Sequence, residues 1–184
     1  RMVGIQTDIT DLKEVEEQLQ DREEMFRQVA NNVQEVVWMA KPGKREHIYV
    51  NPLYEEIWGQ SVESLYEDPM SFLDPIHPDD RERVKQALPL QSEGEYDIEY
   101  RVIGPEGTVH WINDHAKSIT DENGEVYRVV GIAEDITRYK KTQQELREAK
   151  EKLEATNKEL EKTVREDELT GLPNRRYFNE TLSR

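Results

Sequence analysis

The sequence predicts an α+β protein, in which an antiparallel sheet with short helices is flanked by two long helices. Apolar and charged residues alternate strictly from Glu95 to Val102, which is typical of a half-buried strand. Asn123-Gly124 is the strongest short signal for a hairpin between two strands. From Arg138 to Glu166 there is no Gly or Pro, and good helix formers dominate, so this run predicts a continuous helix.

The N-terminal part predicts a long helix and then a hairpin. From Asp11 to about Asn31 apolar residues recur at steps of three and four, which indicates an amphipathic helix. Glu35–Met39 and His47–Val50 are short β-prone runs on either side of a turn at Lys41–Lys44. These two runs are expected to pair.

Short helices are expected between this hairpin and the later strands. Asn51 is a predicted N-cap for a helix that ends at Gly59, and residues 61–65 predict a single turn. His77-Pro78-Asp79-Asp80 has the composition of a helix start, and this helix is expected to end near Leu88-Pro89. Three strands follow, over residues 96–102, 109–120 and 126–136.

Composition excludes several classes of function. Residues 25–137 carry ten Lys/Arg against 22 Asp/Glu, so this segment repels nucleic acids and anionic lipid surfaces. The chain has no cysteine, which excludes disulfides and thiolate chemistry. No apolar run reaches the roughly 20 residues of a membrane span. A cytoplasmic location is expected, and a membrane anchor upstream of Arg1 is left open.

The predicted C-terminal helix has two alternative heptad seams. Leu146, Leu153 and Leu160 repeat every seven residues. If leucine is at position a, Thr and Ala occupy d; if leucine is at d, position a contains residues such as Asn157. A lone helix with so thin an apolar stripe is marginal in water, so a partner helix and a homodimer are expected.

A short motif occurs twice. Arg1–Thr10 and Arg128–Thr137 agree at seven of ten positions, at an offset of 127 residues. The second copy reads VGIAEDIT from Val130 to Thr137, where a strand is expected to pass directly into a helix. The signalling residues expected at this joint and along the following helix are Asp135, Ile136, Thr137, Leu146, Leu153, Asn157 and Leu160.

Four stretches in register resemble the PAS/PAC sensory family. They read IYVNPLYEEIWG, FLDPIHPDDRERV, EYRVIGPEGTVHWI and VGIAEDIT. The resemblance implies a PAS fold over residues 25–137, with a five-stranded antiparallel sheet and short helices on one face. Residues 1–10 then resemble the last strand of an upstream PAS domain. Residues 11–24 would form a linker helix, and residues 138–166 a coiled-coil signalling helix.

Residues 167–184 resemble the start of a GGDEF domain. The run DELTGLPNRRYF implies a diguanylate cyclase output that makes cyclic di-GMP from GTP with Mg²⁺. No Gly-Gly pair occurs in the chain, so the catalytic loop is absent and this fragment itself is not expected to be an enzyme. The residues that carry the resemblance are Asp167, Leu169, Thr170, Gly171, Leu172, Pro173, Asn174, Arg175 and Arg176.

A ligand pocket is one of two interpretations of the aromatic residues in the PAS segment. They either surround a flat ligand between the sheet and the helices or fill the core. Trp38, Tyr49, Tyr96 and Trp111 belong to this aromatic group. Resemblance to flavin-binding PAS proteins implies pocket positions, among which Asp114 is unusual because a buried carboxylate is costly. The pocket candidates are Trp58, Phe72, Tyr100, Val102, Ile112, Asp114, Ala116 and Ala133.

The cofactor stays unknown and none is required. Covalent flavin chemistry needs a cysteine that the chain lacks, and His77 fits a helix start better than a haem ligand. His110 and His115 are five residues apart, hence on opposite faces of a strand, so no metal site is expected. His47 is expected at the surface. No catalytic residue is expected, because no nucleophile accompanies the carboxylate pairs.

The sequence therefore favours a sensory and dimerisation module that relays a signal through a coiled coil to a GGDEF domain. One alternative is a ligand-free PAS scaffold that sets dimer geometry. Another is a PAS module that binds a non-covalent flavin or a small metabolite. A downstream histidine kinase is less favoured, because no phospho-acceptor helix is present.

Overall fold

The computed structural model describes residues 10–43, 46–94 and 96–165. The chain divides into two compact units, Arg1–Thr137 and Arg138–Arg184. The first unit holds the sheet, its covering helices and the N-terminal helix α1 (Thr10–Asn32). The second contains nearly all of α6 (Thr137–Arg165).

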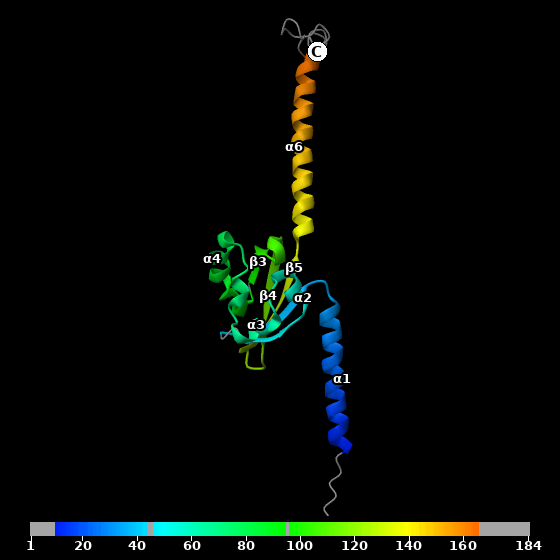
Figure 1. Ribbon diagram of the computed structural model, residues 1–184, viewed down its shortest axis with the longest axis vertical. Helices are drawn as coiled ribbons and strands as arrows, with labels where there is room; N and C mark the ends of the chain where they lie inside the picture. The colour runs from blue at the N-terminus through cyan, green and yellow to red at the C-terminus, as the bar shows by residue number, and fades with distance from the viewer. Residues whose placement is uncertain (1–9, 44–45, 95, 166–184) are drawn as a thin grey trace, which may run out of the picture. The chain divides into compact units, whose positions relative to one another are not determined.

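The first unit is built on a five-stranded antiparallel sheet in the order β2-β1-β5-β4-β3 (Figure 1). The last strand of the chain, β5, therefore lies in the middle of the sheet. The strands are β1 (Val36–Ala40), β2 (His47–Val50), β3 (Tyr96–Ile103), β4 (Val109–Thr120) and β5 (Val126–Asp135). This confirms the predicted α+β class, the PAS fold and the flanking helices.

Helical segments between β2 and β3 cover one face of the sheet and close the core. Tyr96, Tyr100 and Val102 of β3 point into this core and are buried, as their alternation with charged residues predicts. The segments are α2 (Leu53–Trp58), α3 (Val62–Glu67), η1 (Ser71–Leu73), α4 (Pro78–Ala87) and α5 (Leu90–Glu93); η2 (Pro105–Gly107) lies between β3 and β4.

Asn51 differs from its predicted role as an N-cap. Pro52 occupies the N-cap position of α2, and no side chain caps that helix. The buried Asn51 amide instead donates to the carbonyl oxygens of Ala30 (2.8 Å) and Glu35 (2.9 Å), and its oxygen accepts from the Val37 N–H (3.2 Å). Asn51 therefore ties the end of α1 to the start of β1, which satisfies backbone groups that the helix end leaves open.

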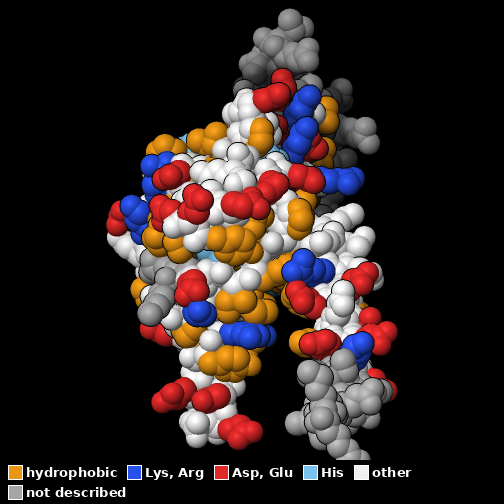
Figure 2. Space-filling model, turned by 60° about the horizontal axis from the view of Figure 1, so that its bottom comes forward, with side chains coloured by type: hydrophobic (Ala, Val, Ile, Leu, Met, Phe, Trp, Pro, Cys, Tyr) orange, Lys and Arg blue, Asp and Glu red, His pale blue; other side chains and the backbone are white. Residues whose placement is uncertain are grey.

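On the face shown in Figure 2, acidic and basic side chains are interspersed with apolar ones. On α1, Val15, Leu19 and Val29 are more than half exposed. No helix among the described residues is long and apolar enough to cross a membrane.

Candidate functional site

An interior cavity of about 50 Å³ lies in the core of the first unit. Aromatic side chains from separate elements form much of its wall: Trp38 of β1, Tyr54 and Trp58 of α2, Phe72 of η1 and Tyr100 of β3. On this measure one water molecule needs about 10–15 Å³. The cavity thus has room for a few waters or a very small molecule, and is far below the roughly 300–1,000 Å³ of ordinary cofactor pockets.

Asp114 of β4 places a carboxylate in this aromatic cavity, and Asp114 is only 4% exposed. It accepts hydrogen bonds from Trp38 Nε1 (3.0 Å), Tyr100 Oη (2.9 Å) and Tyr96 Oη (3.2 Å). Burial raises the pKa of Asp114 to about 6, although the three donors oppose this rise. In the part of the chain that the structure describes, no Lys or Arg side chain is hydrogen-bonded to this carboxylate. Asp114 is thus held by neutral donors.

His47 and Trp58 bring unpartnered polar atoms to the same wall. Both ring nitrogens of His47 and Nε1 of Trp58 are buried without a hydrogen-bond partner. Burial lowers the pKa of His47, and the nearby Pro69 carbonyl offsets this only in part, so the imidazole is neutral. The prediction that His47 lies at the surface is wrong for its ring nitrogens. A ligand or ordered water is the ordinary partner for such atoms.

The position of the Trp38 ring depends on Gly131. The two residues lie directly opposite each other in the β1–β5 pair. A Cβ atom at Gly131 would lie 2.2 Å from Cε2 and Cζ2 of Trp38, so the ring covers bare backbone here. Glycine on the central strand therefore allows Trp38 to lie against β5 while its side chain also lines the cavity.

The structure brings part of the predicted pocket set together. Trp58, Phe72, Tyr100, Asp114 and Ala133 all line the cavity. The remaining candidates are buried in the core but are not part of the cavity wall: Val102, Ile112 and Ala116.

Two of the aromatic residues lie away from the cavity. Tyr49 packs edge-on against Phe26 of α1, and Trp111 lies under the Arg101 guanidinium on the other face of the sheet. Sequence reasoning missed Tyr54, which stacks on Trp58 with ring centroids 5.1 Å apart. Their spacing of four residues on one helix was the available signal.

A hydrogen-bonded joint connects β5 to α6. The Ile136 N–H donates to the Trp111 carbonyl oxygen (2.8 Å), and the Trp111 N–H donates to Thr137 Oγ1 (2.8 Å). Asp135 Oδ1 accepts from the Thr137 N–H (2.9 Å) and from its hydroxyl. Asp135 Oδ2 lies 2.7 Å from His110 Nδ1. The predicted joint residues Asp135, Ile136 and Thr137 are therefore all attached to β4.

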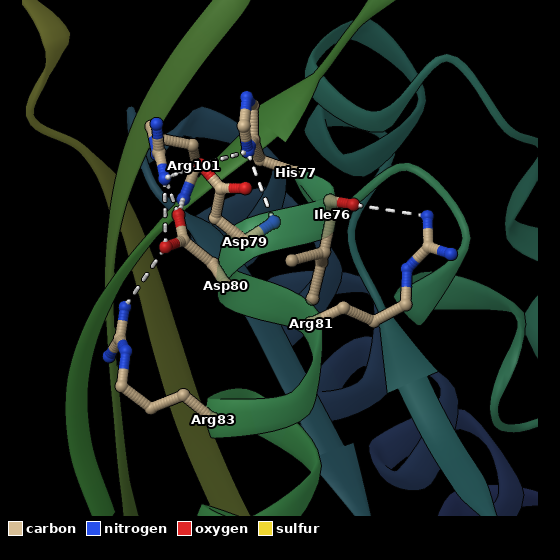
Figure 3. A network of polar contacts seen from close by, with 7 residues as sticks. All are labelled: Ile76, His77, Asp79, Asp80, Arg81, Arg83 and Arg101. Carbon is tan, nitrogen blue, oxygen red and sulfur yellow. Dashed lines mark hydrogen bonds and ion pairs between the residues drawn. The ribbon is translucent and has the colours of Figure 1, made fainter.

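A second polar network attaches α4 to β3 (Figure 3). Asp80 is the most buried acidic residue of this network. Its carboxylate accepts hydrogen bonds from the backbone N–H (3.0 Å), Nε (2.8 Å) and Nη2 (3.0 Å) of Arg101. Hydrogen bonding to Arg101 lowers the pKa of Asp80. The Arg101 guanidinium in turn lies 5.5 Å from the ring centre of Trp111, whose backbone holds the joint. Contacts thus run from α4 through β3 and β4 to the start of α6.

The leucines of the α6 repeat are solvent-exposed. Leu146, Leu153 and Leu160 have exposed fractions of 70%, 61% and 57%. Ion pairs one turn apart, such as Arg147–Glu151, add modest support to the single helix. The leucine stripe is an apolar surface with no partner within the described part of the second unit.

Other predicted features fall outside the described residues or form no site there. The motif at Asp167–Arg176 and the first copy of the repeat, Arg1–Ile9, lie outside the described residues. Among the described residues no three His, Asp or Glu side chains are grouped as metal ligands. His77 caps α4, with Nδ1 accepting from the Asp79 N–H (3.3 Å).

The sheet order and the covering helices are those of the PAS fold. Residues 47–133 match the protein-family model described as PAS fold. This chain is similar over its whole length to the uncharacterised protein y4lL of Sinorhizobium fredii, with 30% identity over 188 residues that cover 21% of that protein.

Two further relatives are sensor proteins. Over 41% of this chain and 15% of the relative, the similarity to the sensor protein FixL of Bradyrhizobium diazoefficiens reaches 40% identity. A solved sensory box histidine kinase/response regulator structure from Burkholderia thailandensis has a TM-score of 0.51 and 31% identity, covering 71% of this chain and 98% of that one. The chain spans about a fifth or less of the length of the curated relatives it matches.

Proposed function

We propose that the chain is the sensory and dimerisation part of a cytoplasmic diguanylate cyclase. In this proposal the PAS domain changes the arrangement of paired α6 helices, and these control a GGDEF domain that makes cyclic di-GMP from GTP and Mg²⁺. The sensor proteins among the relatives support the signalling role. The resemblance of Asp167–Arg176 to the start of GGDEF domains supports the output.

The joint between β5 and α6 is the observation that carries this proposal. Asp135, Ile136 and Thr137 make hydrogen bonds to one another or to Trp111 and His110 of β4. These contacts support the proposal that a displacement of β4 or β5 moves Thr137, the first residue of α6. The sheet that lines the cavity also bears the output helix.

The exposed leucine stripe on α6 supports the dimerisation in this proposal. Two seams are available, one with leucine at position a and one with Asn157 at a. A buried Asn at an a position lowers the stability of the seam that contains it. The two seams are therefore close in energy in this proposal and can act as a switch. In the proposed mechanism the signal shifts the balance between these two seams.

Disulfide trapping tests the switch. Ala149→Cys and Asn157→Cys introduce single thiols into a chain that has no cysteine, so every crosslink is assigned without background. The expected result is that stimulus, or substitution at the joint such as Asp135→Ala, changes the ratio of crosslinking at the two positions. Lys152→Cys serves as a control for nonspecific collisions. Identical ratios in both states would reject the two-seam switch.

The output is tested on the full-length protein. It is incubated with GTP and Mg²⁺, and the products are separated by liquid chromatography and identified by mass. Formation of cyclic di-GMP that changes with Asp135→Ala supports the whole proposal. If no cyclic di-GMP forms under any condition, the cyclase assignment is rejected. The crosslinking experiment then still tests the sensory role.

The small cavity favours a second candidate function, a ligand-free scaffold that only sets dimer geometry. Native mass spectrometry and an absorption spectrum of freshly purified protein separate the two candidates. A bound mass or chromophore supports a sensor. A bare polypeptide mass that no small molecule changes supports the scaffold.

A further inference from the structure

The cavity combines a buried carboxylate with several aromatic side chains. Asp114 is held by three neutral donors, and no hydrogen bond or ion pair from a described Lys or Arg balances its charge. Tyr54, Trp58 and Phe72 line the cavity alongside Trp38 and Tyr100. The face of an aromatic ring is electron-rich and attracts cations, most strongly for Trp. Both features of this wall therefore favour a positive charge inside the cavity.

We propose that the cavity binds a small methylated ammonium ion. Asp114 supplies the counter-charge, and the aromatic wall surrounds the methyl groups. This assigns a ligand class to the PAS cavity and is independent of which output domain the helix α6 controls.

The hydrogen bonds of Asp114 favour methylation over a bare ammonium group. Its oxygens already accept from Trp38, Tyr96 and Tyr100, so the carboxylate has charge to offer but few free acceptor positions. A primary ammonium brings three donors that each need an acceptor in a dry site. A fully methylated ammonium carries the same charge without any donor, and its methyl groups suit an apolar wall.

The size and charge of the domain agree with this ligand. A cavity of about 50 Å³ admits a compact ion but not a flavin or haem ring system. Residues 25–137 carry ten basic against 22 acidic groups, which concentrates cations near the domain and disfavours anions. Trp58 Nε1 lacks a partner, so an ammonium ion that also carries a hydroxyl oxygen is expected to bind more tightly than one without.

The direct test is titration calorimetry of the chain with tetramethylammonium chloride, with choline as the hydroxyl-bearing probe. The uncharged control is tert-butanol, which has the same compact shape and number of heavy atoms as tetramethylammonium. Saturable binding of the cation at least about tenfold tighter than that of tert-butanol is expected, given desolvated cation–π and charge contacts. Equal binding of both would show that the positive charge does not strengthen binding and would overturn the proposal.

Matched variants identify the charge that matters. Asp114→Asn keeps the shape of the side chain and is expected to weaken tetramethylammonium binding about tenfold or more, without a matching effect on tert-butanol. Asp97→Asn removes the same charge from the exposed side of β3 and is expected to leave binding nearly unchanged.

A second pair of variants tests the aromatic wall without touching the carboxylate. Trp58→Phe retains a ring, and Trp58→Leu removes it; the expected loss of affinity is about three- to thirtyfold larger for leucine. Circular dichroism confirms that each variant is folded. Absence of saturable cation binding by the folded chain, or equal affinities for all variants, would reject the site. Neither result bears on the crosslinking test of α6.

Discussion

At the scale of single residues, Asp114 has the most unusual environment in the PAS domain. Burial favours the protonated form of this carboxyl because desolvation penalises the charge, and the hydrogen bonds from its neutral donors offset this only in part. The pKa of Asp114 is raised to about 6 from its ordinary value of 3.8. The folded state therefore holds the Asp114 proton more tightly than the unfolded chain does.

The pH dependence of stability follows from this difference. Between pH 3.8 and about 6 the folded state binds more protons at Asp114, so its contribution to the free energy of unfolding is lost as pH rises through this window. The size of the effect is about 3 kcal/mol at most. Asp114→Asn is expected to flatten the pH profile in urea unfolding experiments between pH 4 and 7.

Asp97→Asn provides the control, because it removes an exposed acidic charge from the neighbouring strand. General repulsion among the acidic groups also weakens the fold as pH rises, and both variants relieve that repulsion equally. If the two variants give the same pH profile, Asp114 does not titrate in this window.

Arg101 is the second residue with an unusual role, because it contacts both Asp80 of α4 and the ring of Trp111. Arg101→Lys removes the planar fork that reaches two oxygens of Asp80. The expected fall in the urea midpoint is roughly twice or more that of Arg83→Lys, whose Nη2 lies 3.6 Å from the same carboxylate. A fall no larger than that of Arg83→Lys would contradict the role of Arg101 in attaching α4.

Single-residue roles were only partly predictable from the sequence. Asp114 stood out because the resemblance to flavin-binding PAS proteins implies an inward, pocket-facing position for it, where an acidic residue is unusual. Asn51 was misassigned, since its partners Ala30 and Glu35 are set by the approach of α1 to β1 and not by its neighbours in sequence. His47 was misassigned for the same reason, because segments between α3 and η1 shield its ring.

At the scale of elements, the contact of β1 with β5 depends on one close approach, that of Trp38 to Gly131. Gly131→Ala places a methyl group 2.2 Å from the indole ring, so the ring or the strand has to move. The expected destabilisation is about 1–3 kcal/mol, typical of overpacked cores, measured by urea unfolding.

A double-mutant cycle separates this clash from other effects of alanine on the strand. In a Trp38→Leu background the same Gly131→Ala change is expected to cost much less, because the smaller side chain leaves room. An equal cost in both backgrounds would show that the Trp38 ring is not the obstacle.

Most elements were predictable because their signals are local. The alternation in β3, the Asn123-Gly124 turn and the helix start at His77 each depend on neighbouring residues alone. The helix α5 was missed, since Pro89 was taken as the end of a helix whereas Pro89 is the N-cap residue of a new one. Proline is compatible with either role, and packing against β4 decides between them.

At the scale of the whole molecule, the exposed leucine stripe of α6 gives the proposed dimer a direct test. Leu153→Gln is expected to raise the dimer dissociation constant about 100-fold or more, since the dimer loses two leucines, one from each helix, and each buried leucine contributes about 1.5–3 kcal/mol. Analytical ultracentrifugation measures the change. Lys152→Gln, on an adjacent exposed position, is expected to leave the constant unaltered, and a purely monomeric chain would contradict the proposed coil.

The start of β1 lies beside the end of β5 in the sheet. Val36, the first residue of β1, pairs with Ala133, two residues before β5 ends at Asp135. The chain therefore enters the sheet after α1 and leaves it after β5 at neighbouring points. The Cα atoms of a directly paired couple such as Val36 and Ala133 are about 5 Å apart. Gene duplication can insert such a unit between two helical segments without altering the outer connections.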